Sequence, residues 1–350
     1  MIRLIWKGYH TKAKYVIIKY NNYGGLSMSL EEIIEDIKRG LKGNPIEDMS
    51  YLKEQTLKYN GHEYQNEIDM AIGKLSLEAV TNKDNNISKE KLEEEAEEIK
   101  KSYEKAVRLC NDKRFKDAGN ILEEIIDKIR NKSEAGNTYF SFGSALNLWL
   151  YTLVFDPKQM INQSLTDNSS IYKLYAYTLA QTYKIDEAIA SLEEGLKWEP
   201  VNVSILLELG EISRLRGEYE KFLGATKNAI IFSLSSHELS ICYCRLAIYF
   251  EEIKDYRTAI CLYHLSNSFE RNIYSARRLD KMRMELGLKV EVPSNEKMNR
   301  VLKEKDIPLG PSEYVISAIT SLAKNSKENG SIEIYRFCKD TYKDLTGEDL

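Results

Sequence analysis

Residues 171–200 read IYKLYAYTLAQTYKIDEAIASLEEGLKWEP, and this stretch decides the fold class. Its small residues follow a fixed spacing, with Ala188 twelve positions after Ala176 and Gly195 seven positions after Ala188. Large apolar residues repeat at helical spacing on both sides of these positions: Tyr172, Tyr175, Leu179, Leu192 and Leu196. The stretch therefore predicts a pair of helices that approach closely at their small residues, and Pro200 closes the unit.

The same spacing recurs along the chain, which is typical of an array of repeats. The next unit, residues 203–239, keeps Gly210 and Ala229 but has Phe222 where an alanine is expected, so its two helices are expected to pack less tightly. The unit at 240–273 follows the spacing with Ala247, Ala259 and Ser266. The unit at 99–132 follows it with Ala106 and Ala118, but Ile125 replaces the last small residue. Between the unit at 99–132 and the unit that begins at residue 169, residues 133–168 have room for one irregular unit. The sequence therefore predicts an all-α protein with a helical array over residues 86–286.

This pattern resembles the tetratricopeptide repeat, specifically over residues 169–273. The resemblance implies an α-α superhelix whose first helices line a concave groove that binds a partner. By helical phase, the groove-facing candidates are Lys173, Tyr177, Gln181, Leu207, Glu211, Arg214, Cys244, Ile248 and Glu251. The segments GNPIEDMSYLKEQTLKYNGHEY and IPLGPSEY are also similar to parts of uncharacterised clostridial repeat proteins, which implies a bacterial protein and no activity.

Two flanking regions differ from the array. Residues 28–85 predict an N-terminal helical bundle, opened by a capping box at Ser29 and Glu32 and closed by turn chemistry at 81–86. Residues 287–350 predict a linker and two capping helices, about 312–326 and 331–345. Residues 1–27 are basic, and the Gly24-Gly25 pair just before Met28 can be encoded by a run like a bacterial ribosome-binding site. We therefore expect translation to start at Met28. The alternative is a basic hairpin or membrane-surface arm.

Charge and composition exclude several classes of protein. The chain has 350 residues, 43% of them hydrophobic, and a net charge of −4; without the five cations of residues 1–27 the remainder carries −9. An acidic body disfavours binding to nucleic acid. No apolar run is long enough to span a membrane. The five cysteines are scattered through helical patterns, which indicates reduced thiols and a cytoplasmic location.

No motif for catalysis is found. The four histidines lack metal-ligand spacing, and no phosphate-binding or nucleophile loop is present, so we expect no metal, no cofactor and no enzyme activity. The acidic run Glu93 to Glu98 is interpreted as a solvated helix surface without a pocket.

Two functions follow. The first is a non-catalytic scaffold or adaptor that binds a protein or peptide in the groove, with Tyr177 and Arg214 as exposed anchors. The second is a peptide-sensing regulator whose N-terminal bundle acts on a signalling partner. The sequence favours the first, because residues 46–58 lack a basic recognition helix.

Overall fold

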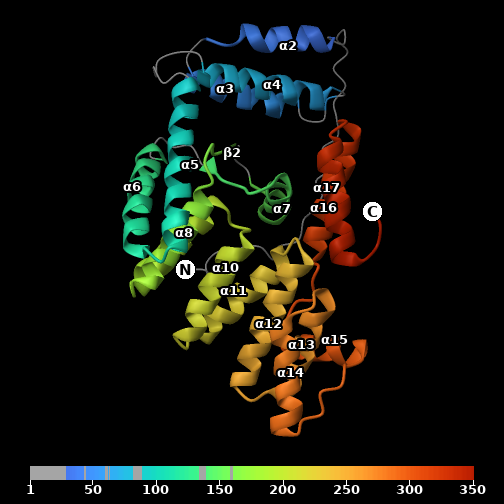
Figure 1. Cartoon of the computed structure of the whole chain (residues 1–350). Helices are drawn as coiled ribbons and strands as arrows, with labels where there is room; N and C mark the ends of the chain where they lie inside the picture. Colours follow the sequence, from blue (N-terminus) through green and yellow to red (C-terminus); the bar gives the residue numbers. More distant parts are fainter. Residues whose placement is uncertain are drawn as a thin grey trace. The chain divides into compact units, whose positions relative to one another are not determined.

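The computed structural model describes residues 29–42, 45–59, 62, 64–81, 89–133, 139–157 and 161–350. Figure 1 shows the chain and labels most of its helices. The chain divides into two compact units at Leu92 and Glu93. Residues 1–27 and most of the expected boundary at 81–86 lie outside the described residues, so the predictions made for them are not addressed. The described part is all-α apart from one pair of two-residue strands.

Where the structure describes the first unit, it contains three complete helices, α2 (Leu30–Arg39), α3 (Pro45–Lys58) and α4 (Gln65–Thr81). The capping box at the start of α2 is present: the Glu32 amide donates to the Ser29 hydroxyl at 3.3 Å, and the Ser29 amide donates to the Glu32 carboxylate at 2.8 Å. The helices share a small core of Ile33, Ile37, Leu52, Ile68, Ile72 and Leu75. This unit therefore has a hydrophobic core of its own.

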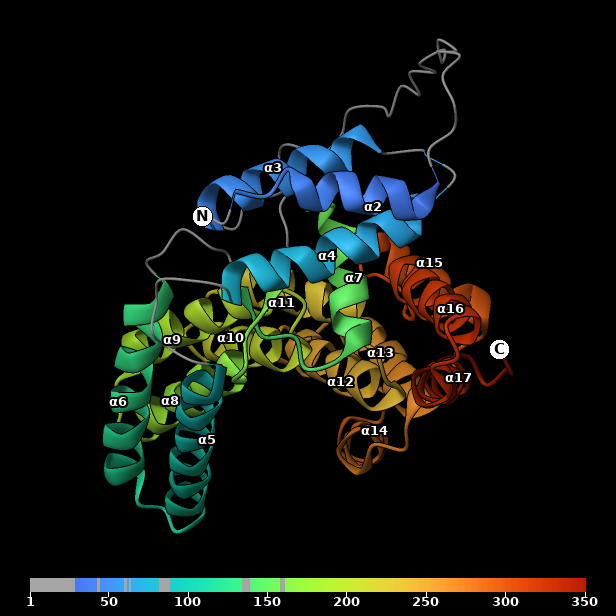
Figure 2. The ribbon, with the colours of Figure 1, turned by 90° about the horizontal axis from the view of Figure 1, so that it is seen from above.

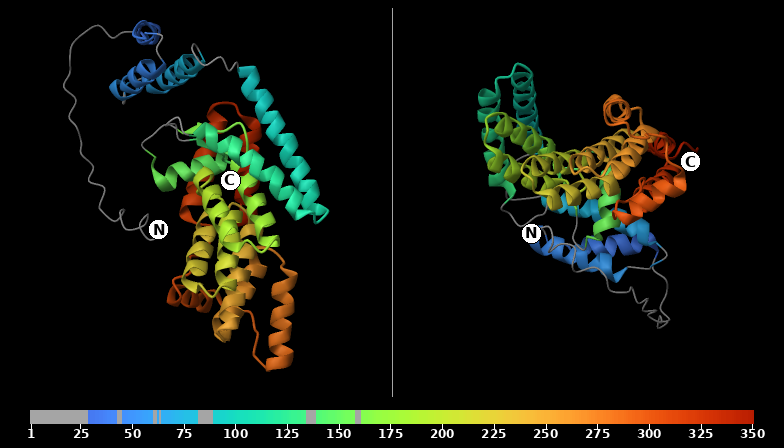
Figure 3. Two further views of the ribbon diagram at one scale, coloured as in Figure 1. Left: turned by 90° about the vertical axis from the view of Figure 1, so that its left-hand side faces the viewer. Right: turned by 90° about the horizontal axis from the view of Figure 1, so that it is seen from below.

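The second unit is built from helix pairs. These are α5 (Lys89–Asn111) with α6 (Phe115–Ser133), α8 (Asn168–Gln181) with α9 (Ile185–Trp198), α10 (Val203–Leu215) with α11 (Tyr219–Phe232), and α12 (Ser236–Glu252) with α13 (Tyr256–Phe269). Helices α8 to α13 lie side by side in sequence order, as Figures 2 and 3 show. The expected repeat architecture of paired helices is confirmed.

The small residues of the repeat lie where helices pack closely. Ala176 and Ala188 are buried, and a Cβ added at Gly195 would lie 2.9 Å from the Ile205 Cδ1 atom. Phe222, which replaces the expected alanine, is fully buried, and a Cβ at Gly210 would lie 3.6 Å from its ring. Phe222 is therefore accommodated in the contact between α10 and α11, next to Gly210.

The turns inside the helix pairs share one geometry. The residue two positions after each first helix has a positive φ: Lys113, Tyr183, Gly217 and Lys254. The next amide then bonds back to a carbonyl of the first helix, as from Glu218 to Ser213 at 2.8 Å. This is the left-handed helix ending that glycine favours, and here only one of the four residues is glycine.

The segment 139–168 interrupts the row of pairs. Strand β1 (Tyr139–Phe140) pairs in parallel with β2 (Asn162–Gln163), and α7 (Ala145–Phe155) lies between them in the sequence. Helix α7 packs against α16 (Glu313–Glu328), far along the chain, and its Phe155 ring lies 6.3 Å from the Phe232 ring of α11. In residues 139–157 and 161–168, the expected irregular unit therefore consists of α7, two short strands and the beginning of α8.

The C-terminal region corrects one expectation. Helices α16 and α17 (Ile332–Thr346) form at nearly the predicted positions, but they do not cap the end of the row. Instead α14 (Ile273–Leu286) packs against α13, and α16 packs on α7 and α11. The intervening segment contains α15 (Asn295–Glu304), and the buried Tyr243 hydroxyl then bonds the Pro308 carbonyl and the Gly310 amide at 3.0 and 2.7 Å. These bonds tie the C-terminal segment back to α12.

None of the described helices combines the length and the apolar character that crossing a bilayer requires.

Candidate functional site

The predicted groove residues lie on the first helices α8, α10 and α12, whose shared side we call the first-helix face. Tyr177 and Gln181 are exposed on this face, and Lys173, Glu211, Arg214, Ile248 and Glu251 are partly buried. Polar contacts join neighbouring first helices: the Lys173 ammonium donates to the Ser204 hydroxyl at 3.1 Å, from α8 to α10. The face is therefore a connected surface with restricted side chains.

Two of the predicted residues, Leu207 and Cys244, are buried, which corrects their assignment as accessible residues. The next first helix in the row lies against each of these residues. The Arg245 guanidinium of α12 donates to the Leu207 carbonyl, and Ser275 of α14 interacts with the Cys244 thiol, whose pKa is raised by burial. Helical phase alone predicted that these side chains are exposed, because it takes no account of the neighbouring helix.

Arg214 is likewise different from the exposed anchor that the sequence predicts. Its side chain is 14% exposed and pairs with two carboxylates, that of Glu211 on its own helix at 2.6 Å and that of Glu252 on α12. The hydrogen bond from Arg214 lowers the pKa of Glu211 although burial opposes this shift. Arg214 therefore links α10 to α12.

Glu251 has a similar linking position at the end of α12. Its carboxylate accepts hydrogen bonds from the Tyr263 hydroxyl of α13 at 2.7 Å and from the Arg278 Nε of α14 at 3.0 Å. These bonds connect three helices, and burial together with the bonded carboxylate raises the pKa of Tyr263. Glu251 is thus part of the structure of the repeat unit.

Tyr177 is the large residue of this face that stays available. It is 46% exposed, and its ring packs edge-on against Phe115 of α6, with ring centroids 5.7 Å apart. One side of the ring is fixed while the rest reaches solvent. An aromatic side chain held in this way is suited to contact a partner at low entropic cost.

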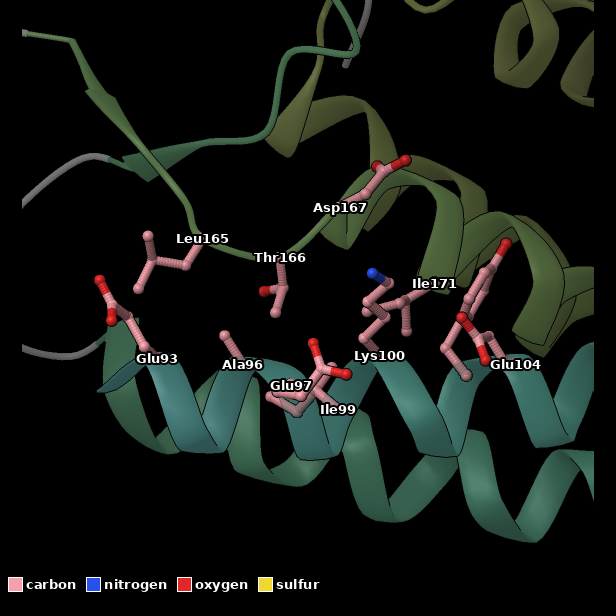
Figure 4. Close-up of a pocket in the computed structure, with 11 residues that line it drawn as sticks. Glu93, Ala96, Glu97, Ile99, Lys100, Glu104, Leu165, Thr166, Asp167 and Ile171 are labelled. Carbon is pink, nitrogen blue, oxygen red and sulfur yellow. The ribbon is translucent and has the colours of Figure 1, made fainter. Parts of the chain in front are cut away.

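A second feature, which the sequence analysis missed, is a hollow of about 580 Å³ between α5 and the segment leading into α8. Figure 4 shows its lining. Residues from α5 are Glu93, Ala96, Glu97, Ile99, Lys100, Tyr103 and Glu104, and those from the other side are Leu165, Thr166, Asp167 and Ile171. The acidic run was interpreted as a plain solvated surface, whereas Glu93 and Glu97 line this hollow. The signal that pointed to it is the apolar series Ala96, Ile99, Tyr103 beside those acids.

The five cysteines are all buried and unpaired. Burial raises the pKa of Cys242 to about 12, so its thiol stays protonated at neutral pH. Within the described ranges, His, Cys, Asp and Glu side chains form no group of three that could hold a metal ion.

No protein-family model matches the chain, and no curated protein is similar to it.

Proposed function

We propose that the chain is a non-catalytic binding module of the tetratricopeptide type, and that it holds a protein or peptide segment across the first-helix face. The observation that carries the proposal is Tyr177, an exposed aromatic side chain on a face where Lys173, Arg214 and Glu251 are bonded across helices. A surface that is ordered before binding loses less entropy when a partner docks. We place the module in the cytoplasm, since its buried thiols need no oxidising compartment.

The test compares two tyrosines. The full-length protein and its Tyr177→Ala variant capture partners from an extract of the native host, and captured proteins are quantified by mass spectrometry. Tyr177→Ala should lower capture of the specific partner by at least about 1 kcal/mol, roughly fivefold, because exposed aromatic anchors carry much of the binding energy. The matched control is Tyr183→Ala, which removes a tyrosine that is 91% exposed in the turn after α8.

Equal capture by wild type and Tyr177→Ala would refute the role of the first-helix face. Equal losses in both tyrosine variants would show a general surface effect instead. Circular dichroism of each variant checks that the helices are retained.

A second function, a peptide-sensing regulator, is supported by the division of the chain. The first unit has its own core, so it could act on a signalling partner while the second unit binds a peptide. Removal of residues 1–92 should then abolish signalling but leave peptide binding intact. Binding lost together with signalling would contradict this division of roles.

A further inference from the structure

The hollow beside α5 has a floor that differs chemically from its rim. The floor consists of Ala96, Ile99, Tyr103 and Ile171, of which Ile99 and Ile171 are buried. Leu165 stands opposite α5 and is 66% exposed, which is unusual for a leucine next to an apolar surface. In Figure 4 the labelled α5 residues lie on one side of the hollow and Leu165, Thr166 and Asp167 on the other. An apolar side chain inserted here would bury Leu165 and the floor together.

The rim carries four carboxylates, from Glu93, Glu97, Glu104 and Asp167, against the single ammonium of Lys100. Asp167 also caps α8, where its carboxylate accepts from the Ser170 amide at 3.0 Å, so its negative charge is fixed in place. Glu97 and Glu104 lie two helical turns apart, about 10 Å along the helix axis. Glu104 also pairs with Arg108 at 3.7 Å, so the excess negative charge at the mouth of the hollow comes chiefly from Glu93, Glu97 and Asp167.

From this complementarity we propose that the hollow binds a cationic amphipathic segment of a partner protein. An apolar side chain of the segment enters between Leu165 and Tyr103, and flanking lysines or arginines approach Glu97 and Asp167. This inference rests on the proposed function, since it assigns a ligand class to a second surface of the same binding module. The hollow and Tyr177 are different surfaces, so the two can be tested apart.

The probe is a designed peptide of about sixteen residues that alternates leucine and lysine at helical spacing, with a terminal fluorophore. Its control is the same peptide with glutamate in place of lysine. Fluorescence anisotropy with the full-length protein should give a Kd on the order of 10 μM for the lysine peptide and much weaker binding for the glutamate peptide. Raising the salt concentration from about 0.05 M to about 0.5 M should weaken binding of the lysine peptide, because its charges contact solvent-exposed carboxylates at the rim.

Variants of α5 locate the binding. Glu97→Lys replaces an electrostatic attraction by a repulsion and should weaken binding of the lysine peptide roughly tenfold. Glu98→Lys is the matched control: it makes the same charge change on the neighbouring residue, which is also exposed but outside the lining, and should change the Kd by less than about threefold. Lys100→Glu should tighten binding, because it removes the one cation of the lining. Leu165→Ala should weaken it roughly fivefold through lost apolar contact.

The outcomes separate the proposals. Equal weakening by Glu97→Lys and Glu98→Lys, or equal affinity for both peptides, would overturn the assignment of the hollow. Self-association of the protein that Glu97→Lys abolishes would also overturn it, because the occupant would be a second copy. Normal peptide binding in Tyr177→Ala, together with partner capture that does not depend on Tyr177, would refute the first-helix face and leave the hollow as the binding surface.

Discussion

Ala188→Leu tests the repeat packing directly. Ala188 is fully buried in the contact between α8 and α9, within a cluster that also contains Ala176, Leu179, Leu192 and Ile205. A leucine adds three carbons where no space is open, and overpacking of a close-packed core costs about 1–3 kcal/mol. Alanine and leucine have similar helix propensities, so the change in free energy of unfolding comes almost wholly from packing.

The matched control is Ala190→Leu, which makes the same change two residues later at an exposed position of α9. It should alter the free energy of unfolding by less than about 0.5 kcal/mol. Urea unfolding is followed by tryptophan fluorescence, since Trp149 and Trp198 both belong to the second unit. A loss of about 2 kcal/mol shifts the midpoint down by roughly 0.5–1 M. If both variants unfold at the wild-type midpoint with the wild-type slope, Ala188 is not a helix contact and the assignment of the repeat is wrong.

Three further perturbations have defined outcomes. Gly224→Ala should raise the free energy of unfolding by about 0.5–1 kcal/mol, because alanine is favoured over glycine inside a helix and nothing lies within 4 Å of the added Cβ in α11. An unchanged or lower urea midpoint would contradict this. Glu199→Ala should lower the free energy of unfolding by about 1–3 kcal/mol, because the buried Glu199 carboxylate accepts hydrogen bonds from the Gly143 amide, the Ser169 hydroxyl and the Asn202 side-chain amide at 2.9, 3.1 and 2.6 Å. Backbone amides of residues 139–143 should then exchange faster with deuterium, and unchanged exchange would argue against this anchoring. Burial raises the pKa of Glu238, so the folded wild type binds a proton more readily than the unfolded chain and loses stability as pH rises through that pKa. Glu238→Gln should therefore raise Tm relative to wild type at pH 7 and lose this advantage near pH 4, and a Tm difference independent of pH would contradict the sign.

The helix pairs were predictable because small and large residues keep a fixed spacing. The turns between them were not equally readable. Gly217 is the residue expected at a left-handed helix ending, but Tyr183, Lys113 and Lys254 adopt the same conformation with side chains that usually avoid it. The packing of each helix pair stabilises this left-handed backbone conformation, which costs conformational energy at the residue that adopts it. Local sequence preferences therefore do not predict it.

The site residues show the limit of helical phase. Lys173, Leu207 and Cys244 occupy equivalent positions in three successive units, yet only Lys173 reaches the surface. In all three units the following first helix lies beside this position, and Lys173 bonds Ser204 of α10 there. The long charged side chain of Lys173 still reaches the surface, whereas the shorter side chains of Leu207 and Cys244 are buried. Phase identifies which side of a helix faces its own partner, but exposure depends on the next helix in the row, which a single repeat does not encode.

The hollow arises where the repeat is interrupted. Segment 139–168 has no helix-pair spacing, and its helix α7 packs on α16 instead of continuing the row after α6. The chain returns to the row through Leu165 and Asp167, and Asp167 then caps α8. The apolar residues of α5 that a regular next unit would cover are thus faced by a short loop, and they line an open hollow. In a helical array the place where periodicity fails is where an apolar surface stays uncovered, so the least repetitive segment of this chain creates the surface that we assign to a cationic partner segment.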